Sequence, residues 1–508
     1  MRRFIILIAL GLLGFPQTEN SRPRPLRFHI TLSKEIAPKG AKGRLFVFLA
    51  GSEESQPILT AGFLPGATRL AAMEIEYWGP GEMVDFNPDI RAYPKPFSQM
   101  NAGNYRSMAL LDQNHSLPYN GEDGDDLYGP VISLPNLNPA DTASIALTVD
   151  RKMNPGPQFA DTENIRKAEF QSPLLSAFWG RPIVMRAGVV LPPETDQNAR
   201  ALYPAAYHVH GFGGNYTEAW IEGPRLVEAM RRGSRSRMIH IFLNGAWPTG
   251  HHEFADSVNN GPWGRALTEE FIPWLEKRYP MIGQSHGRFL TGHSSGGWST
   301  LWLQINYPDF FGGTWSTSPD PVDFLSFTGF DATPDSRDNA YRLSNGTLRN
   351  LVVMNGLEVT TMKDFVRYEE VQGEYGGQIS SFEWVFSPRG PDGRPMQLFN
   401  RITGNLDPEV LAAWRNYDIR YTLSRNWTKL EPRLRGKIHI FCGTNDTFHL
   451  NEATALLCSF FQSKGSDAVC ELIPGRDHFN LYESYRSYPR GLAERIDHEM
   501  AQSAAGGR

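Results

Sequence analysis

Cysteine is scarce in this sequence, which excludes a scaffold built on many disulfides. Only three cysteines occur in 508 residues, whereas small disulfide-dependent domains carry many more. Cys442 ends an apolar run and is expected to be a buried thiol. Cys458 and Cys470 flank the end of a predicted helix and the next predicted strand, and the sequence leaves open whether they pair. The C-x-x-C and H-E-x-x-H spacings of zinc sites are missing, so we expect no metal site and no cofactor.

An excess of basic residues and a long apolar segment are also missing. The formal net charge is −5, so a nucleic-acid partner is not expected. Every apolar run is shorter than the roughly 20 residues that span a membrane, so we expect no membrane anchor. Residues 4–15 form a short apolar run behind Arg2 and Arg3, which is typical of a secretory signal peptide. We therefore expect residues 1–20 to be a signal peptide and the protein to be secreted or periplasmic.

The remaining sequence divides into two parts with different patterns. Residues 24–155 contain short apolar or alternating runs separated by turn-rich segments, which predicts a β-rich domain resembling a β-sandwich. Residues 175–500 alternate apolar runs with amphipathic segments, which predicts an α/β domain with a mostly parallel central sheet. Residues 320–435 interrupt that alternation, and we expect them to form a long insertion.

The segment around Ser294 carries the strongest chemical signature. Gly292, Ser294 and Gly296 form the pattern G-x-S-x-G between an apolar run and a predicted helix. A strand, a sharp turn and a helix in that order are typical of a nucleophile elbow. The glycines allow the backbone to turn tightly, which leaves the serine side chain exposed above the sheet. A merely structural glycine turn is the alternative, but the flanking elements favour Ser294 as a nucleophile.

A glycine-rich loop earlier in the chain complements this serine. The sequence H-G-F-G-G begins at His210, directly after a predicted strand. Such a loop provides backbone N–H groups that stabilise the oxyanion of a tetrahedral intermediate. We expect the oxyanion hole to consist of Gly211, Phe212 and Ser295, and we expect His210 to shape the loop rather than to act as a base.

An acid and a base are expected after the serine, in that order. Asp446 follows one apolar run, and His478 lies on the loop after the next run. We therefore predict that His478 accepts the proton of Ser294 and that Asp446 orients His478. Asp320 and Asp323 are rival acids, because both follow the predicted strand after the serine. Weaker alternatives are Asp477 as the acid and His449 as the base.

These motifs resemble those of the putative esterase (esterase-D-like) family of α/β-hydrolases. The resemblance lies in the elbow G-H-S-S-G-G, the loop H-G-F-G-G and the segment D-S-V-N-N-G-P at residues 256–262. It covers residues 180–490 and implies an α/β-hydrolase fold with Ser294, Asp446 and His478 as catalytic residues. The family includes feruloyl, acetyl xylan and enterochelin esterases, S-formylglutathione hydrolases and mycolyltransferases. The insertion and the N-terminal domain depart from its compact members and leave the substrate open.

The sequence therefore predicts a secreted serine esterase that hydrolyses carbohydrate-linked aromatic or short acyl esters, as feruloyl and acetyl esterases do. Trp247, Trp263 and Trp298 fall near the predicted site and are expected to bind the substrate, because flat aromatic faces suit sugar rings and cinnamoyl groups. One alternative is an enterochelin esterase-like hydrolase or an acyltransferase. Another is a non-catalytic binding protein on a hydrolase fold, although the complete set of motifs argues against it.

Overall fold

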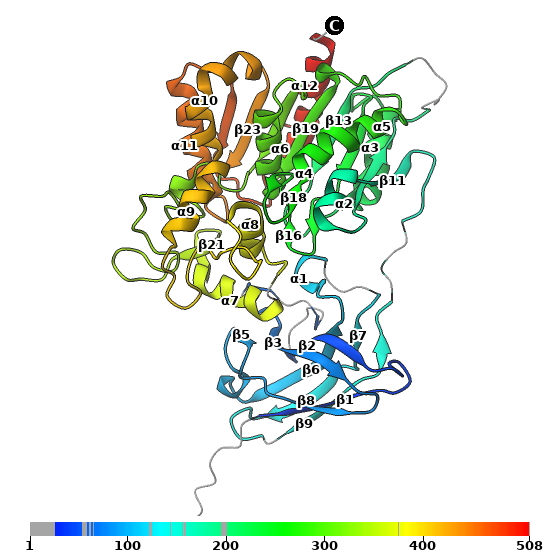
Figure 1. Cartoon of the computed structure of the whole chain (residues 1–508), viewed down its shortest axis with the longest axis vertical. Helices are drawn as coiled ribbons and strands as arrows, with labels where there is room; N and C mark the ends of the chain where they lie inside the picture. Colours follow the sequence, from blue (N-terminus) through cyan, green and yellow to red (C-terminus); the bar gives the residue numbers. More distant parts are fainter. Residues whose placement is uncertain are drawn as a thin grey trace, which may run out of the picture.

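The computed structural model describes residues 26–506 apart from 53–57, 60–61, 65, 121–123, 143, 155, 157–158, 195–200 and 374. The expected signal peptide, residues 1–20, lies outside these described residues. Figure 1 shows a β-rich N-terminal part below a larger part in which helices cover a central sheet. In the described part of the chain, helices with the length and apolar character needed to cross a membrane are absent.

The N-terminal part contains two β-sheets with a shared core. Its strands are β1 (Phe28–Leu32), β2 (Ala41–Gly51), β3 (Arg69–Trp78), β4 (Met83–Phe86), β5 (Ala92–Tyr93), β6 (Gly103–Asp112), β7 (Leu127–Tyr128), β8 (Ile132–Leu137), β9 (Ile145–Val149) and β10 (Arg151–Lys152). One sheet has the order β4-β1-β9; the other has the order β10-β7-β6-β2-β3-β5, with β8 paired to β6. Alternate residues of the two sheets, such as Phe28 and Ile30 of β1 and Leu45 and Val47 of β2, enter one apolar cluster, because successive strand side chains point to opposite faces.

The larger part is built on an eight-stranded sheet. In spatial order its strands are β11 (Ile165–Gln171), β12 (Val184–Val190), β14 (Ile239–Leu243), β13 (Ala205–Val209), β19 (Arg288–His293), β20 (Gly313–Thr317), β23 (Ile438–Gly443) and β24 (Val469–Ile473). The pairs β11–β12 and β12–β14 are antiparallel, and every later pair is parallel. The expected α/β fold is confirmed.

Helices cover both faces of this sheet. They are α2 (Pro173–Trp179), α3 (Glu218–Arg231), α4 (Trp263–Arg265), α5 (Ile272–Glu276), α6 (Ser295–Asn306), α10 (Ile419–Leu434), α11 (Leu450–Ser463) and α12 (Leu492–Gly506), with a π-helical turn at Ala266–Phe271. Neighbouring residues of β19 enter different clusters: Phe289 packs with Met500 of α12, and Leu290 packs with Leu275 of α5. Strands such as β19 that are buried on both faces have continuous apolar sequences, because side chains on both faces enter a core.

The insertion lies between β20 and α10. It contains β21 (Asn350–Met354), β22 (Leu357–Thr361), α7 (Met362–Gln372), α8 (Gln378–Phe386) and α9 (Pro408–Trp414). Helix α10, which the sequence assigned to the insertion at 320–435, packs against α6 of the α/β layer, and its residues Leu423 and Leu430 belong to the same apolar cluster as Leu301 of α6. The insertion therefore ends earlier than expected.

Helix α7 joins the insertion to the N-terminal sheets (Figure 1). Tyr368 and Val371 of α7 belong to the same apolar cluster as Phe46 and Phe48 of β2. Arg44 of β2 donates from Nε to the carbonyl oxygen of Val371 at 3.0 Å and from Nη2 to that of Glu370 at 3.0 Å. A buried residue of the N-terminal part thus binds the carbonyl groups at the end of a helix in the insertion.

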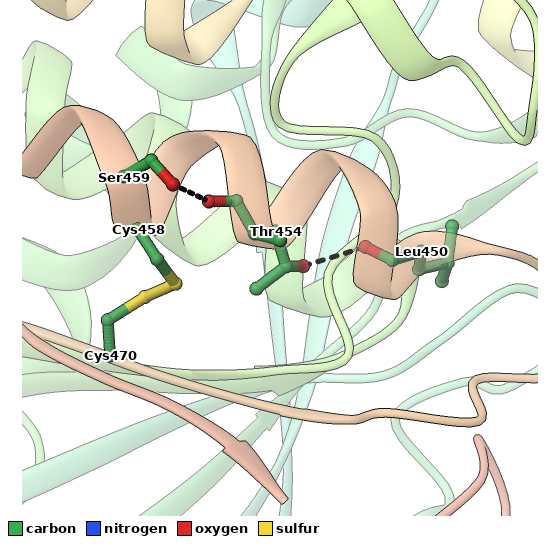
Figure 2. The surroundings of a disulfide bond; sticks show 6 residues. Leu450, Thr454, Cys458, Ser459 and Cys470 are labelled. Carbon is green, nitrogen blue, oxygen red and sulfur yellow. Dashed lines mark hydrogen bonds between the residues drawn. A yellow bond between two sulfur atoms is a disulfide. The ribbon is translucent and has the colours of Figure 1, made fainter.

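A disulfide bond joins Cys458 of α11 to Cys470 of β24, as Figure 2 shows. The sequence left this pairing open, and the fold resolves it by placing α11 beside the edge strand of the central sheet. Within α11 the hydroxyl of Thr454 donates to the carbonyl oxygen of Leu450 at 2.8 Å. Cys442 is a buried free thiol.

Candidate active site

Ser294 occupies the sharp turn between β19 and α6. Its backbone has φ 59° and ψ −123°, and a positive φ is uncommon for a residue other than glycine. The turn leaves no space for a side chain at Gly296, where a Cβ atom would lie 1.9 Å from the carbonyl oxygen of Val209. Backbone strain of this kind persists only where the surrounding structure enforces it, and it clusters at functional sites.

Asp446 and His478 meet at the carboxyl edge of the same sheet. Asp446 follows β23 and His478 follows β24, and Nδ1 of His478 lies 2.9 Å from Oδ2 of Asp446. Oδ1 of Asp446 accepts the backbone N–H of Phe448 at 3.0 Å. Burial opposes ionisation, but the hydrogen bond and charge of His478, together with the Phe448 N–H, bring the pKa of Asp446 below its ordinary value. The ionised carboxylate therefore holds the imidazole by its Nδ1 proton.

His293, the residue before Ser294, packs against His478. The two ring centroids are 4.5 Å apart, and Nδ1 of His293 lies 3.1 Å from the hydroxyl of Thr317. Burial, aided by the proximity of His478, lowers the pKa of His293 to about 3, so its ring is neutral at ordinary pH. Sequence reasoning missed this residue, although its place inside the G-x-S-x-G pattern was the available signal.

The glycine-rich loop after β13 lies beside Ser294. A Cβ atom at Gly211 would lie 3.2 Å from Cβ of Ser294, and Phe212 follows directly. His210 fixes the loop, because its Nδ1 lies 2.7 Å from the carbonyl oxygen of Gly211 and its Nε2 accepts the N–H of Gly245 at 2.8 Å. This pattern places the proton on Nδ1, and burial lowers the pKa of His210 to about 3.

Ser295 begins α6 directly after the serine turn. The first N–H groups of a helix have no acceptor within the helix, and the helix dipole gives this end a partial positive charge. The N–H of Ser295 therefore follows Ser294 directly, and Gly211, the residue before Phe212, lies close to Ser294. Such an arrangement can bind an oxyanion formed next to the serine.

A second buried carboxylate, that of Asp320, contacts the serine turn. Its Oδ1 lies 3.4 Å from Oγ of Ser294, and its Oδ2 accepts a hydrogen bond from Oγ of Ser295 at 2.5 Å. Burial and then the nearby carboxylate of Glu253 raise the pKa of Asp320 to about 7. The other rival acid, Asp323, instead pairs with Arg420 at 2.7 Å.

Glu253 extends this acidic cluster below the turn. Its Oε2 accepts a hydrogen bond from the hydroxyl of Ser299 in α6 at 2.7 Å, and its Oε1 lies 3.1 Å from Nδ1 of His251. Burial raises the pKa of Glu253 well above its ordinary value. Its own backbone has φ 57°. Among the described residues, His, Cys, Asp and Glu side chains form no group of three or more that could hold a metal ion.

The two weaker alternatives from the sequence are engaged elsewhere. Asp477 accepts the backbone N–H groups of Phe479 and Asn480, each at 2.9 Å, so it stabilises its own loop. His449 directly precedes α11, and its Nδ1 lies 3.5 Å from Oε1 of Glu452 in that helix. Only Asp446 of the four acids considered hydrogen-bonds to His478 among the described contacts.

Trp263 and Trp298 do not line the site, contrary to the expectation that they bind substrate. Their exposed fractions are 2% and 1%. Trp263 stacks on His252 with ring centroids 3.7 Å apart, and Trp298 stacks on Trp302 at 5.1 Å. Burying a large indole ring is favourable, and proximity in sequence to the serine does not decide which way the ring points. Trp247 is half-buried and packs against Trp263 at 5.3 Å.

The family model described as "Putative esterase" matches residues 182–479. No curated protein matches the chain. Solved structures similar to the chain include a ferulic acid esterase with 16% identity and a TM-score of 0.39, in a match covering 62% of this chain and 90% of that one. An S-formylglutathione hydrolase from Agrobacterium tumefaciens has 14% identity and a TM-score of 0.38, covering 70% and 99%. A fluorophosphonate-binding serine hydrolase from Staphylococcus aureus has 13% identity and a TM-score of 0.38, covering 67% and 98%.

Proposed function

Because the chain belongs to the "Putative esterase" family, it is a serine esterase, and we propose that Ser294, Asp446 and His478 are its catalytic residues. The observation that carries this proposal is the 2.9 Å contact between Nδ1 of His478 and Oδ2 of Asp446, and the positive φ of Ser294 agrees with it. The packing of His293 on His478 supports it further, because His293 is the chain neighbour of Ser294.

In the proposed mechanism, His478 takes the proton of Ser294 while the serine oxygen attacks the carbonyl carbon of the ester. The N–H groups of Gly211, Phe212 and Ser295 stabilise the resulting oxyanion. The bond to the alcohol then breaks, and His478 gives its proton to the leaving oxygen. Water, deprotonated by His478, attacks the acyl-enzyme and releases the acid, which restores Ser294. Asp446 stabilises the imidazolium in both halves of the reaction.

The proposed substrate is a carbohydrate-linked ester with an aromatic or short acyl group, met outside the cytoplasm. Phe479 supports the proposal of an aromatic acyl group, because an exposed aromatic ring next to the base can pack against such a group. Phe479 is 66% exposed, and its ring centroid lies 5.4 Å from that of His478. The apolar run behind Arg2 and Arg3 supports export. N-terminal sequencing of secreted protein tests the export proposal, and a product that begins at Met1 would contradict it.

The substrate proposal is tested by kcat/KM on four esters: methyl ferulate, acetylated xylan, enterobactin and tributyrin. We expect methyl ferulate or acetylated xylan to give the highest value. Ser294→Ala is the control for background hydrolysis. A clear preference for enterobactin or tributyrin would contradict the substrate class and leave the esterase chemistry intact.

A further inference from the structure

A cavity of about 1560 Å³ lies between the N-terminal sheets and the insertion. Its walls come from separate elements: Ala92 of β5, Pro118 of α1 (Leu117–Asn120), Arg367 of α7 and Trp384 of α8. Figure 1 shows these elements meeting where the two parts of the molecule join. Sites for small molecules usually measure about 300–1,000 Å³, so this cavity has room for a ligand of several linked units.

The cavity lies next to the glycine-rich loop of the active site. Pro118 lines the cavity, and its neighbour Tyr119 lines a small hollow together with His210 and Phe212. On the facing hairpin of β15 (Ala246–Trp247) and β16 (Gly250–His251), Pro248 lines the cavity and Gly250 lines the hollow. Neighbouring residues of both segments therefore line the two spaces, which places the cavity near the glycine-rich loop beside Ser294.

Aromatic faces border the cavity. The rings of Tyr375 and Trp384 are both half-buried, with centroids 5.6 Å apart in an edge-to-face arrangement. The guanidinium of Arg394 lies 5.4 Å from the centroid of Tyr375. Gln397 adds an exposed amide group to the lining, and Asn400 adds an amide nitrogen, since its Oδ1 already accepts the backbone N–H groups of Ile402 and Thr403. Flat apolar rings beside amide donors and acceptors match a ligand with both apolar C–H faces and hydroxyl groups.

The charge of the lining is nearly balanced. Five arginines and six acidic residues line the cavity, and several of them are paired with each other. Arg401 contacts Glu383 at 2.6 Å, and Arg44 contacts Glu74 at 3.4 Å. A balanced lining gives no net attraction for a polyanion or a polycation. The ligand that fits this surface is therefore polar and uncharged.

We propose that this cavity binds a neutral oligosaccharide, which is the carbohydrate portion of the ester that Ser294 hydrolyses. The inference rests on the proposed function as an esterase of carbohydrate-linked esters. Sugar rings pack on Trp384 and Tyr375, and the chain runs past Pro118 and Tyr119 toward the glycine-rich loop. The N-terminal part and the insertion together select the polymer, whereas the central sheet carries out the chemistry.

The test is calorimetric titration of the full-length mature protein with three unesterified sugars: xylohexaose, cellohexaose and mannohexaose. We expect at least one of them to bind. Trp384→Ala and Tyr375→Ala should each weaken that binding by about tenfold or more, and Trp384→Phe should restore most of it. The matched control is Tyr77→Ala, because Tyr77 is 67% exposed on β3 and does not line the cavity; its binding should equal that of the unsubstituted protein.

Hydrolysis of p-nitrophenyl acetate separates this inference from the proposed function. All four variants should keep their turnover of this small ester within about twofold, since the substituted residues do not contact the reacting groups. Arg394→Ala, on an exposed residue, provides a further cavity variant in case an aromatic substitution prevents folding. Failure of all three hexaoses to bind, or equal binding by the alanine variants, would overturn the inference even when p-nitrophenyl acetate is hydrolysed. Loss of that hydrolysis in the unsubstituted protein would instead overturn the proposed function.

Discussion

The hydroxyl of Ser295 donates a 2.5 Å hydrogen bond to Oδ2 of Asp320. This hydrogen bond distinguishes Asp320 from Asp446, the two acids that follow the carboxyl ends of strands after Ser294. Asp320 contacts the hydroxyls of the serine turn, while Asp446 holds Nδ1 of His478. Their pKa values also shift in opposite directions, upward for Asp320 and downward for Asp446. The two acids therefore have different roles and respond differently to substitution.

Ser294→Ala should lower kcat on a small ester by about 10⁴-fold or more, because the nucleophile is lost. The matched control is Ser295→Ala, which removes the hydroxyl bonded to Asp320 but keeps the backbone N–H at the start of α6. We expect Ser295→Ala to retain activity within about tenfold. A fluorophosphonate probe should label Ser294 in both the unsubstituted protein and Ser295→Ala. Labelling that persists in Ser294→Ala would show that another residue is the nucleophile.

Asp446→Asn and His478→Ala should each lower kcat by about 10³-fold or more, and the double variant should be little worse than the poorer single one. Residues that act as one catalytic unit are strongly non-additive. Asp320→Asn should reduce kcat much less, because Asp320 hydrogen-bonds to the serine turn rather than to His478. The assignment of the acid would be wrong if Asp320→Asn were the more damaging change.

The stability of the protein should depend on pH through Asp320. Its pKa of about 7 in the folded protein exceeds the value of about 4 for an exposed aspartate, so folding favours the protonated form. This contribution is complete below about pH 4 and is lost as the pH rises through about 7. The asparagine of Asp320→Asn cannot ionise, so this variant does not lose stability in that way. The Tm of Asp320→Asn minus that of the unsubstituted protein should therefore rise between pH 5 and pH 8.

Asp446→Asn is the control for this experiment. The pKa of Asp446 is lowered in the folded protein, so its carboxyl is ionised in both the folded and the unfolded chain above about pH 4. Its contribution to stability is lost only as the pH falls below that range. From pH 5 to pH 8 the carboxyl of Asp446 itself should therefore add no pH dependence to the Tm difference for Asp446→Asn. A flat Tm difference for Asp320→Asn over the same range would show that Asp320 is ionised throughout.

Replacing Cys458 and Cys470 together by serine should lower the free energy of unfolding by about 3 kcal/mol, because the bond closes a short loop whose residues lie 12 apart. Chemical denaturation of the two proteins measures this difference. A reducing agent should destabilise the unsubstituted protein to a similar extent and leave the double variant unchanged. A reductant effect on the double variant would point to another cause, since Cys442 is a free thiol.

The sequence predicted those features of the fold that depend on residues close together in the chain. The apolar runs became strands buried on both faces, and the flanking glycines allowed the turn at Ser294, because each constraint involves neighbouring residues. The choice between Asp320 and Asp446 required the order of the strands, since both follow the carboxyl end of a strand. The directions of Trp263 and Trp298 required knowledge of which layer packs on each side of α4 and α6.

The disulfide and the extent of the insertion depended on long-range packing for the same reason. The sequence showed that Cys458 and Cys470 bordered adjacent elements, but only the placement of α11 on the edge strand brings them within bonding distance. Helix α10 is amphipathic like the helices of the insertion, and its contact with α6 assigns it to the α/β layer. Neither the disulfide nor the contact between α10 and α6 can be recognised from the sequence of neighbouring residues.

The bonds from Arg44 to the carbonyl groups of Glu370 and Val371 tie the unfolding of the N-terminal part to that of the insertion. Arg44 is 3% exposed, and separating the two parts would break its bonds to these carbonyl groups and expose the apolar cluster that Tyr368 and Val371 share with β2. Unfolding of one part while the other stays folded is therefore unfavourable. The molecule should consequently melt in one cooperative transition, and its N-terminal part is an integral part of the fold rather than an appended module that could be exchanged between enzymes.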